Sequence, residues 1–258
     1  MNKMLATLFL VATTLISPIA IAQSDKPTVV LVHGAFAESS SWNGVAAILR
    51  KQGYPVVALA NPLRSVKTDA RYLGDVLATI KTPVVLVGHS YGGMVISEAA
   101  GSAPNVKALV YVAAFAPEPG ESAVALSGKF PGSTLGAALA PPVPLSGGGN
   151  DLYIAQDKFH DQFAADVAPA ETVLMAATQR PATEAALNEP ASEAAWKKIP
   201  SWFVHGEKDR NIPLAVLDFM AERAKSKKTV VVPGASHVVM ISHPEAVAEL
   251  IGTAAKAE

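Results

Sequence analysis

Short, valine-rich apolar runs alternate with amphipathic stretches along most of the chain. The first three runs are TVVLVHG at 28–34, PVVALA at 55–60 and PVVLVG at 83–88. Continuous apolar runs are typical of strands buried on both faces of a parallel sheet, with helices covering those faces. The pattern predicts an α/β fold with a doubly wound, mostly parallel sheet of about six strands. Such sheets use right-handed crossovers and place their binding site at the carboxyl ends of the strands.

The intervals between the runs carry apolar side chains at helical spacing. Residues 40–53, for example, repeat this spacing from Trp42 to Leu49 and end at Gly53, as helices commonly do. The remaining strands are expected at 107–115, 201–206 and 229–234, and the helices at 40–53, 69–80, 92–101, 214–225 and 244–255.

Residues 117–199 interrupt the alternation, because no βαβ unit is recognisable there. The segment opens with PEPGES, contains a Pro- and Gly-rich piece at 140–149, and continues with Ala-rich pieces between prolines. An interval of about 80 residues is too long for a structureless loop in a compact domain. We therefore expect one α/β domain, 23–258, with 117–199 as a partly helical cap insertion over the strand ends. Its flexible part is expected at 140–149.

The amino-terminal residues have the pattern of an export signal. Lys3 precedes an apolar stretch at 4–16, and the small residues that end at Ala22 fit a cleavage site. The apolar stretch is shorter than the roughly 20 residues that span a bilayer. We expect residues 1–22 to be a signal peptide, giving a periplasmic or secreted protein without stable membrane insertion. A buried amino-terminal helix and an uncleaved anchor are the alternatives.

Composition restricts the possible chemistry. The chain has 258 residues, no cysteine, and a formal net charge of −1 from 21 basic and 22 acidic residues. Disulfides, thiolate catalysis and cysteine-bound zinc are excluded, and without a basic stripe nucleic acid is not an expected partner. The sequence also lacks H-E-x-x-H and a dinucleotide-binding G-x-G-x-x-G, so we expect no metal and no cofactor. It carries no signal for an oligomeric state.

Residues Gly88 to Gly92 satisfy the pattern G-x-S-x-G between an expected strand and an expected helix. A serine at such a strained turn needs small neighbours, and the helix amino terminus favours a developing negative charge. We therefore predict that Ser90 is a nucleophile, the alternative being an ordinary βα turn. His89, which precedes it, is expected to face away from Ser90.

A serine nucleophile needs a base, and the base needs an acid that orients it. His237 follows the last expected strand and is the predicted base, with His243 as the alternative. Asp209 lies in the loop after the strand at 201–206 and is the predicted acid, with Glu118 as the alternative. The resulting chain order of Ser, Asp and His is typical of one large group of α/β enzymes.

Two backbone N–H groups are expected to stabilise the negative oxygen of a tetrahedral intermediate. One belongs to Tyr91, which follows the nucleophile, and the other to Ala35 in the loop after the first strand. Phe36 is the next candidate for this second donor. The side chain of His33, at the start of the same loop, is expected to be structural.

Four segments in this order, VVLVHGAF, VGHSYGGM, GEKDRNIP and GASHVVMISHPE, resemble the α/β-hydrolase superfamily. The resemblance extends over the mature chain and is greatest to small bacterial esterase-like members, which are related to plant methylesterases and hydroxynitrile lyases. It implies a compact sheet without the first two strands of larger relatives, and a cap inserted after Phe115. It also implies the same site residues: Ser90, Asp209, His237, Ala35 and Tyr91.

One position departs from the hydroxynitrile lyases that the chain resembles. Those enzymes generally have a lysine directly after the catalytic histidine, where this chain has Val238. This difference counts against lyase chemistry.

The sequence therefore predicts a serine hydrolase that cleaves carboxylic esters of small to medium, largely apolar molecules through an acyl-enzyme on Ser90. Phe36, Phe130 and Phe159 are candidate walls of the substrate pocket, although such residues equally serve in a core. Two other functions remain open at this point. One is a cofactor-free perhydrolase or haloperoxidase-like activity, and the other is a ligand-binding protein on a hydrolase scaffold.

Overall fold

The computed structural model describes residues 26–257. The expected signal peptide, 1–22, and its cleavage site at Ala22 lie outside these residues. Within 26–257, none of the helices is long and apolar enough to cross a membrane.

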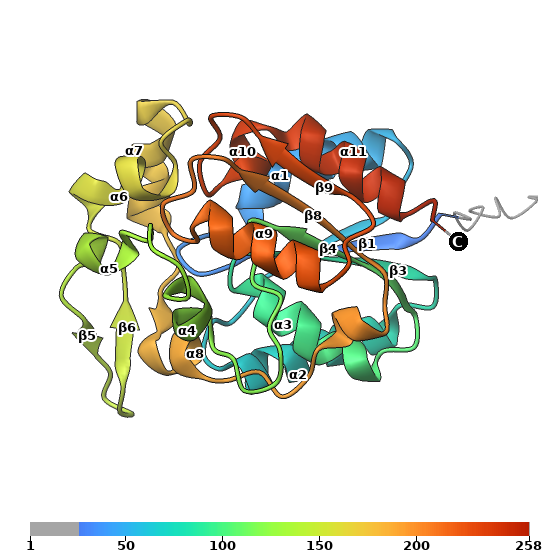
Figure 1. The fold of residues 1–258 in the computed structure, drawn as a ribbon, viewed down its shortest axis with the longest axis horizontal. Coiled ribbons are helices and arrows are strands. Elements are labelled where there is room, and N and C mark those ends of the chain that lie inside the picture. The colour runs from blue at the N-terminus through green and yellow to red at the C-terminus, as the bar shows by residue number, and fades with distance from the viewer. Residues whose placement is uncertain (1–25, 258) are drawn as a thin grey trace, which may run out of the picture.

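Six strands form one sheet in the order β2-β1-β3-β4-β8-β9, and every neighbouring pair is parallel. Figure 1 shows this sheet in the middle of the molecule. The predicted doubly wound α/β architecture is confirmed, and each strand falls on one of the predicted apolar runs. The strands are β1 (Thr28–Val32), β2 (Val56–Leu59), β3 (Val84–His89), β4 (Val106–Val112), β8 (Ser201–Gly206) and β9 (Thr229–Val232).

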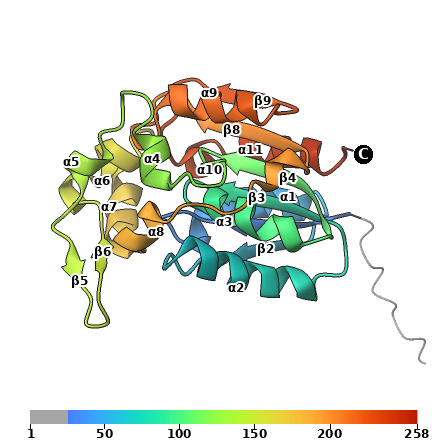
Figure 2. The same ribbon diagram turned by 60° about the horizontal axis from the view of Figure 1, so that its bottom comes forward.

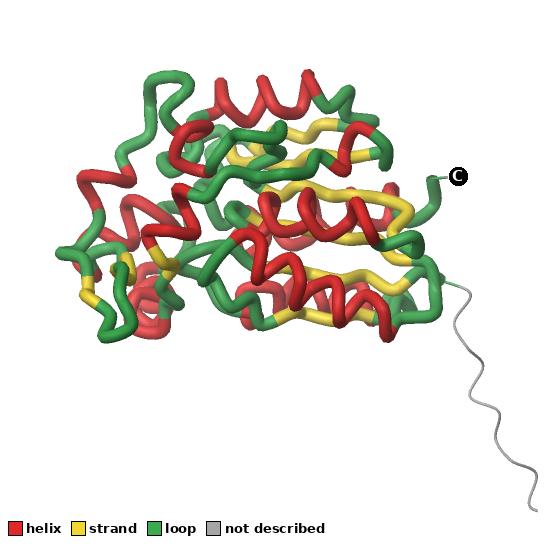
Figure 3. The backbone as a smooth tube through the Cα atoms, turned by 90° about the horizontal axis from the view of Figure 1, so that it is seen from below, coloured by secondary structure: helices red, strands yellow, loops and turns green. Residues whose placement is uncertain are grey.

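Helices cover both faces of the sheet, as the fully apolar central strands require. Helices α1 and α11 pack against each other, and α2 packs against α3 on the opposite face (Figure 2). Seen from below, the strands lie between these layers of helices (Figure 3). The bounds are α1 (Asn43–Lys51), α2 (Val66–Thr79), α3 (Gly92–Ala99), α9 (Leu214–Arg223), α10 (Val239–Ser242) and α11 (Pro244–Ala254), with short 3₁₀ turns η1 (Ser39–Trp42) and η2 (Ala100–Ser102).

The segment between β4 and β8 forms a body at one end of the sheet, on the left of Figure 1. It contains a three-stranded antiparallel sheet, β5-β6-β7, which the sequence analysis did not predict. Its strands have two or three residues, too few to show an alternating pattern. Its elements are α4 (Ala123–Ser127), α5 (Leu135–Ala138), β5 (Val143–Pro144), β6 (Asn150–Leu152), α6 (Gln156–Phe163), α7 (Pro169–Thr178), β7 (Ala182–Thr183), α8 (Glu184–Asn188) and η3 (Ala195–Lys197).

The Pro- and Gly-rich piece at 140–149 holds β5 and the turn that leads to β6. Within this turn, the N–H of Leu145 donates to the carbonyl of Gly149, and the N–H of Gly148 donates to the carbonyl of Leu145. Gly148 and Gly149 take positive φ at the tip, which accounts for glycine at these two positions of the hairpin.

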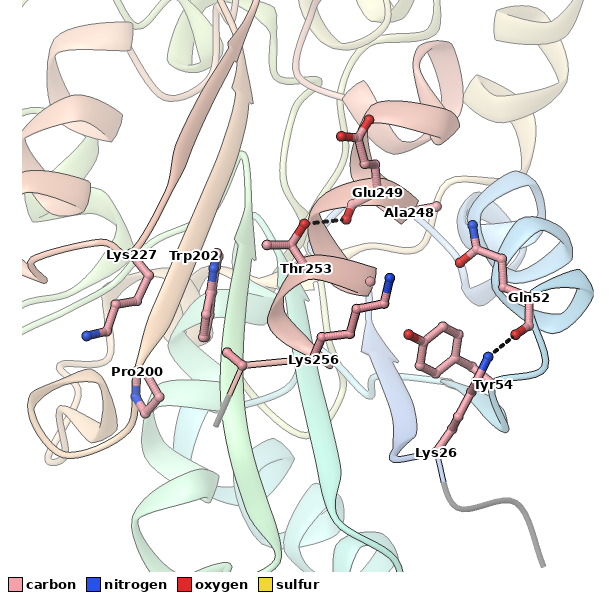
Figure 4. A pocket seen from close by; sticks show the side chains of 12 residues that line it. Lys26, Gln52, Tyr54, Pro200, Trp202, Lys227, Ala248, Glu249, Thr253 and Lys256 are labelled. Carbon is pink, nitrogen blue, oxygen red and sulfur yellow. Dashed lines mark hydrogen bonds between the residues drawn. The ribbon is translucent and has the colours of Figure 1, made fainter.

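A hollow of about 950 Å³ lies at the other end of the sheet, where the strands begin. Figure 4 shows its walls, which come from the residues before β1 and β2, the start of β8 and the carboxyl end of α11. Ligands of doubly wound sheets bind at the carboxyl ends of the strands, and none of the predicted site residues lines this hollow.

Candidate active site

Ser90 occupies a strained turn between β3 and α3. Its φ is +52°, in the left-handed region that non-glycine residues rarely adopt. The turn is fixed by β4: the N–H of Ser90 donates to Val112 (3.2 Å), and the carbonyl of Ser90 accepts from Phe115 (3.2 Å). Neighbouring segments approach closely, since a Cβ on Gly34 would lie 2.6 Å from Ser90 Cβ. The surroundings therefore hold Ser90 in a conformation that it would otherwise avoid.

Asp209 and His237 form a buried pair. Nδ1 of His237 lies 2.7 Å from Oδ2 of Asp209. The other carboxylate oxygen, Oδ1, accepts the N–H groups of Asn211 (2.8 Å) and Ile212 (2.9 Å). Because a carboxylate accepts hydrogen bonds, Nδ1 of His237 carries the proton and Nε2 presents a lone pair. In the described chain Nε2 is buried and has no hydrogen-bond partner.

His89 connects this pair to the turn that bears Ser90. Its Nε2 lies 3.2 Å from the carbonyl oxygen of His237, so Nε2 donates and the carbonyl accepts. The two imidazole rings are 4.8 Å apart, and the ring of Phe163 lies 5.2 Å from that of His237. Burial, and then the proximity of the His237 imidazole, hold the pKa of His89 well below its usual range. His89 is therefore a neutral neighbour of His237, bonded to its backbone.

The alternative acids and bases are engaged elsewhere. Glu118 pairs with Lys197, and Nε2 of the half-exposed His243 lies 3.5 Å from Asp166. Neither side chain contacts the Asp209–His237 pair in the described structure.

The backbone N–H groups of Ala35 and Tyr91, in the two loops beside Ser90, have no hydrogen-bond partner among residues 26–257. A Cβ on Gly34 would lie 3.1 Å from the nitrogen of Tyr91, so the two loops touch. The N–H of Phe36, the other candidate for the second donor, donates to the carbonyl of Arg180 (2.9 Å). The structure therefore leaves Ala35 and Tyr91 available to a ligand oxygen, and Phe36 engaged.

A cavity of about 470 Å³ opens onto these groups. Its walls combine the sheet end with side chains from the inserted segment, and Glu184 is their only charged member in the described chain. The lining residues are Ala35, Phe36, Ser90, Tyr91, Phe115, Ala123, Val124, Ser127, Gly128, Ser133, Leu135, Gly136, Leu139, Leu152, Glu184, Leu187, Asn188, Asn211 and Ile212.

The three phenylalanines named as candidate walls lie in different places. Phe36 lines the cavity, whereas Phe130 and Phe159 do not. Phe130 packs on Phe219 of α9 with ring centroids 5.8 Å apart, and Phe159 is fully buried against Phe163 at 5.0 Å. Apolar character predicts that both side chains are covered, but it does not distinguish a core from a cavity.

The cavity walls that sequence reasoning missed include four leucines of the insertion, among them Leu139, Leu152 and Leu187. Nothing in their spacing marks them, because each comes from a different short element. Residues 26–257 contain no cluster of three or more His, Asp or Glu side chains that could hold a metal ion.

The chain belongs to the alpha/beta hydrolase family, whose model matches residues 29–250. The predicted superfamily is thereby confirmed. A carbendazim hydrolyzing esterase of Nocardioides is 41% identical over 113 residues, which cover 39% of this chain and 47% of the esterase. An alpha-hydroxynitrile lyase of Arabidopsis thaliana is 25% identical over 238 residues, covering 84% of this chain and 92% of the lyase.

The fold is also that of a solved esterase structure. The crystal structure of polyneuridine aldehyde esterase superimposes with a TM-score of 0.77 and 19% identity. The match covers 88% of this chain and 98% of that structure. At this identity the likeness describes the fold alone.

Proposed function

We propose that this protein hydrolyses carboxylic esters, with Ser90 as the nucleophile, His237 as the base and Asp209 as the residue that orients it. The observation that carries the proposal is the unpartnered Nε2 of His237, whose other nitrogen is bonded to buried Asp209. A serine in a strained turn, two unpaired N–H groups and an adjoining cavity accompany it. The similarity to an esterase agrees with this chemistry.

In the first half of the reaction, Nε2 of His237 accepts the proton of Ser90 Oγ as Oγ attacks the ester carbonyl. The N–H groups of Ala35 and Tyr91 stabilise the oxyanion that forms. Collapse of this intermediate breaks the bond to the alcohol, which takes the proton from His237. In the second half, His237 removes a proton from water as the water oxygen attacks the acyl-serine carbonyl. The bond to Ser90 Oγ then breaks, Oγ takes the proton back from His237, and the carboxylic acid leaves.

The cavity favours uncharged, largely apolar substrates. Leucine, valine and phenylalanine side chains make up much of its wall, and no lysine, arginine or histidine lines it in the described chain. A carboxylate elsewhere on the substrate would meet Glu184 and no cation. We also propose that the protein acts after export, because residues 1–22 have the pattern of a signal peptide.

Ester hydrolysis fits this site better than cyanohydrin cleavage, despite the similarity to a lyase. The residue after His237 is Val238, which is fully buried and apolar. The position therefore supplies no ammonium group for a cyanide leaving group.

Hydrolysis of p-nitrophenyl acetate and butyrate by the purified protein tests the proposal. Wild type should turn over these esters, and Ser90→Ala should lose activity by roughly 10³-fold or more. Ser201→Ala is the matched control, since Ser201 is also buried but its hydroxyl has no partner in the described chain. Ester turnover by Ser90→Ala at the wild-type rate would exclude Ser90 as the nucleophile.

A further inference from the structure

One short segment of the insertion, residues 180–183, contacts the loop that carries the Ala35 N–H directly, and it is linked to the turn that carries the Tyr91 N–H through Arg64 and Asp69. On one side, the carbonyl of Arg180 accepts the N–H of Phe36 (2.9 Å), directly after Ala35. The guanidinium of Arg180 donates to Glu38 (3.2 Å) in the same loop. Phe36 has a φ of +61°, so this contact fixes a backbone conformation that is otherwise rare.

On the other side, the segment is hydrogen-bonded to Arg64, which precedes α2. Nη2 of Arg64 donates to the carbonyl of Pro181 (2.7 Å), and Nη1 donates to Asp151 of β6 (2.6 Å). In return, the hydroxyl of Thr183 donates to the carbonyl of Arg64 (2.7 Å), and its N–H donates to Leu63 (3.1 Å). Four hydrogen bonds thus tie Arg64 and its neighbour to the insertion.

The backbone of Arg64 is connected, through Asp69, to the turn that carries Ser90 and Tyr91. Its N–H donates to both oxygens of Asp69, at 3.1 and 3.2 Å. The hydroxyl of Tyr91 donates to Oδ2 of the same carboxylate (3.0 Å). Asp69 and Tyr91 are both buried, with exposed fractions of 0% and 1%. Hydrogen bonds to a charged group in such surroundings are strong and directional.

We propose that Asp69 and Arg64 are positioning residues, which link the cap segment 180–183 to the Tyr91 backbone and thereby set the geometry of the oxyanion hole. This inference rests on the function proposed above. The ring of Tyr91 is anchored at its far end, so the backbone N–H at its near end cannot turn freely. An oxyanion hole stabilises the transition state only when its donors are placed within a few tenths of an ångström, so loosening this anchor lowers kcat more than it raises KM.

Tyr91→Phe tests the link, because it removes the hydroxyl and keeps the backbone N–H. Tyr111→Phe is the matched control: Tyr111 is also fully buried, and its hydroxyl is hydrogen-bonded to Ser97 (2.8 Å) rather than to Asp69. We expect Tyr91→Phe to lower kcat for an ester roughly tenfold or more with little change in KM. Tyr111→Phe should keep the wild-type kcat.

Comparing an ester with its thionoester analogue gives a rate ratio that a nonspecific loss of folded protein would not change. Sulfur accepts hydrogen bonds weakly, so an intact oxyanion hole favours the oxygen ester strongly over its C=S analogue. Misplacement of the Tyr91 N–H should reduce this oxygen-to-sulfur rate ratio in Tyr91→Phe but not in Tyr111→Phe. A wild-type kcat in Tyr91→Phe, or a lowered kcat with an unchanged ratio, would overturn the inference.

Arg64→Met keeps the test decisive if Tyr91→Phe fails to fold. This variant removes the guanidinium bonds to Pro181 and Asp151 but keeps the backbone N–H that Asp69 accepts. It should lower both kcat and the oxygen-to-sulfur ratio, whereas Arg71→Met, at an exposed position in α2, should change neither. Wild-type values in Arg64→Met would overturn the link to the cap. Activity retained in Ser90→Ala would instead overturn the proposed function itself.

Discussion

The imidazole Nδ1 of His237 lies 2.7 Å from Oδ2 of Asp209, and neither side chain has any exposed surface. The contact joins residues far apart in the chain, from the loop after β8 and the loop after β9. Asp209 is also held by N–H groups of its own loop, at Asn211 and Ile212. The pair therefore fixes one imidazole tautomer, with Nε2 as the nitrogen that can accept a proton.

Asp209→Asn should lower kcat roughly 10³- to 10⁴-fold. An amide cannot accept hydrogen bonds at both of its terminal atoms, so its NH₂ must oppose either His237 or the two loop N–H groups. Steady-state kinetics with a p-nitrophenyl ester measure the effect. Glu207→Gln, in the same loop, is the control, since the exposed Glu207 accepts the N–H of Gly234 and pairs with Lys208 rather than with His237. Equal kcat values for the two variants would contradict the role of Asp209.

Gly34→Ala should abolish activity or folding. The added Cβ would lie 2.6 Å from Ser90 Cβ and 2.7 Å from the carbonyl oxygen of His89, and neither neighbour can move without displacing β3. Gly74→Ala is the matched control, because a Cβ at this helical glycine meets nothing within 4 Å. It should stabilise the protein by about 0.5–1 kcal/mol through better helix propensity. Urea unfolding and ester turnover of both variants check the contrast, and an active, stable Gly34→Ala would contradict it.

The protein should lose stability as the pH falls below about 6.5. Asn61 N–H donates to Nε2 of His33 (3.0 Å), so Nδ1 carries the proton and donates to the carbonyl of Gly34 (2.9 Å). Burial lowers the pKa of His33, and a hydrogen bond to Gly34 only partly opposes this. The unfolded chain then binds a proton more tightly than the folded protein. The stabilisation is fully present above the unfolded pKa and is lost as the pH falls towards the folded one.

Urea unfolding at about pH 7.5 and about pH 5 measures this loss. Burial lowers the pKa of His205 as well, so its effect has the same sign. In His33→Gln the free energy of unfolding should fall less steeply between the two pH values than in wild type. An equal fall in both proteins would show that His33 does not contribute.

Leu187→Trp should narrow the range of esters that are cleaved. Leu187 of α8 lines the cavity of about 470 Å³, so a larger side chain removes space for the substrate. The ratio of kcat/KM for octanoate to that for acetate should fall relative to wild type. Leu174→Trp is the control, because Leu174 of α7 is 67% exposed and does not line the cavity. An unchanged chain-length profile in Leu187→Trp would place the substrate elsewhere.

The strands and the loops that carry Ser90, Asp209 and His237 can be predicted from the sequence, because each has a local sequence pattern. Buried parallel strands are continuous apolar runs, and the turn at Ser90 demands glycine at close approaches such as Gly92, where a Cβ would lie 2.5 Å from the carbonyl of Val32. Order along the chain then places the three loops at one end of the sheet.

The contacts of the insertion could not be predicted in this way, because they join short elements that are far apart in the sequence. Arg64 is hydrogen-bonded to Pro181, and Phe36 is hydrogen-bonded to Arg180. No periodicity in the sequence predicts either contact. The hydrogen bond between Asp69 and Tyr91 was not predictable from the sequence either. Helical spacing places Asp69 on α2, but the packing of α2 on α3 is what brings Asp69 to Tyr91. For Phe130 and Phe159, apolar character is compatible with either core or cavity, and packing assigns both away from the cavity.

Covalent labelling with a fluorophosphonate tests the central claim most directly, because this reagent phosphonylates only activated serines. We predict one labelled peptide, with the modification on Ser90, in wild type and in the control Ser201→Ala. Labelling should disappear in His237→Ala, in which no base accepts the proton of Ser90. Modification of a different residue, or undiminished labelling of Ser90 in His237→Ala, would contradict the assignment of Ser90 and His237 as nucleophile and base.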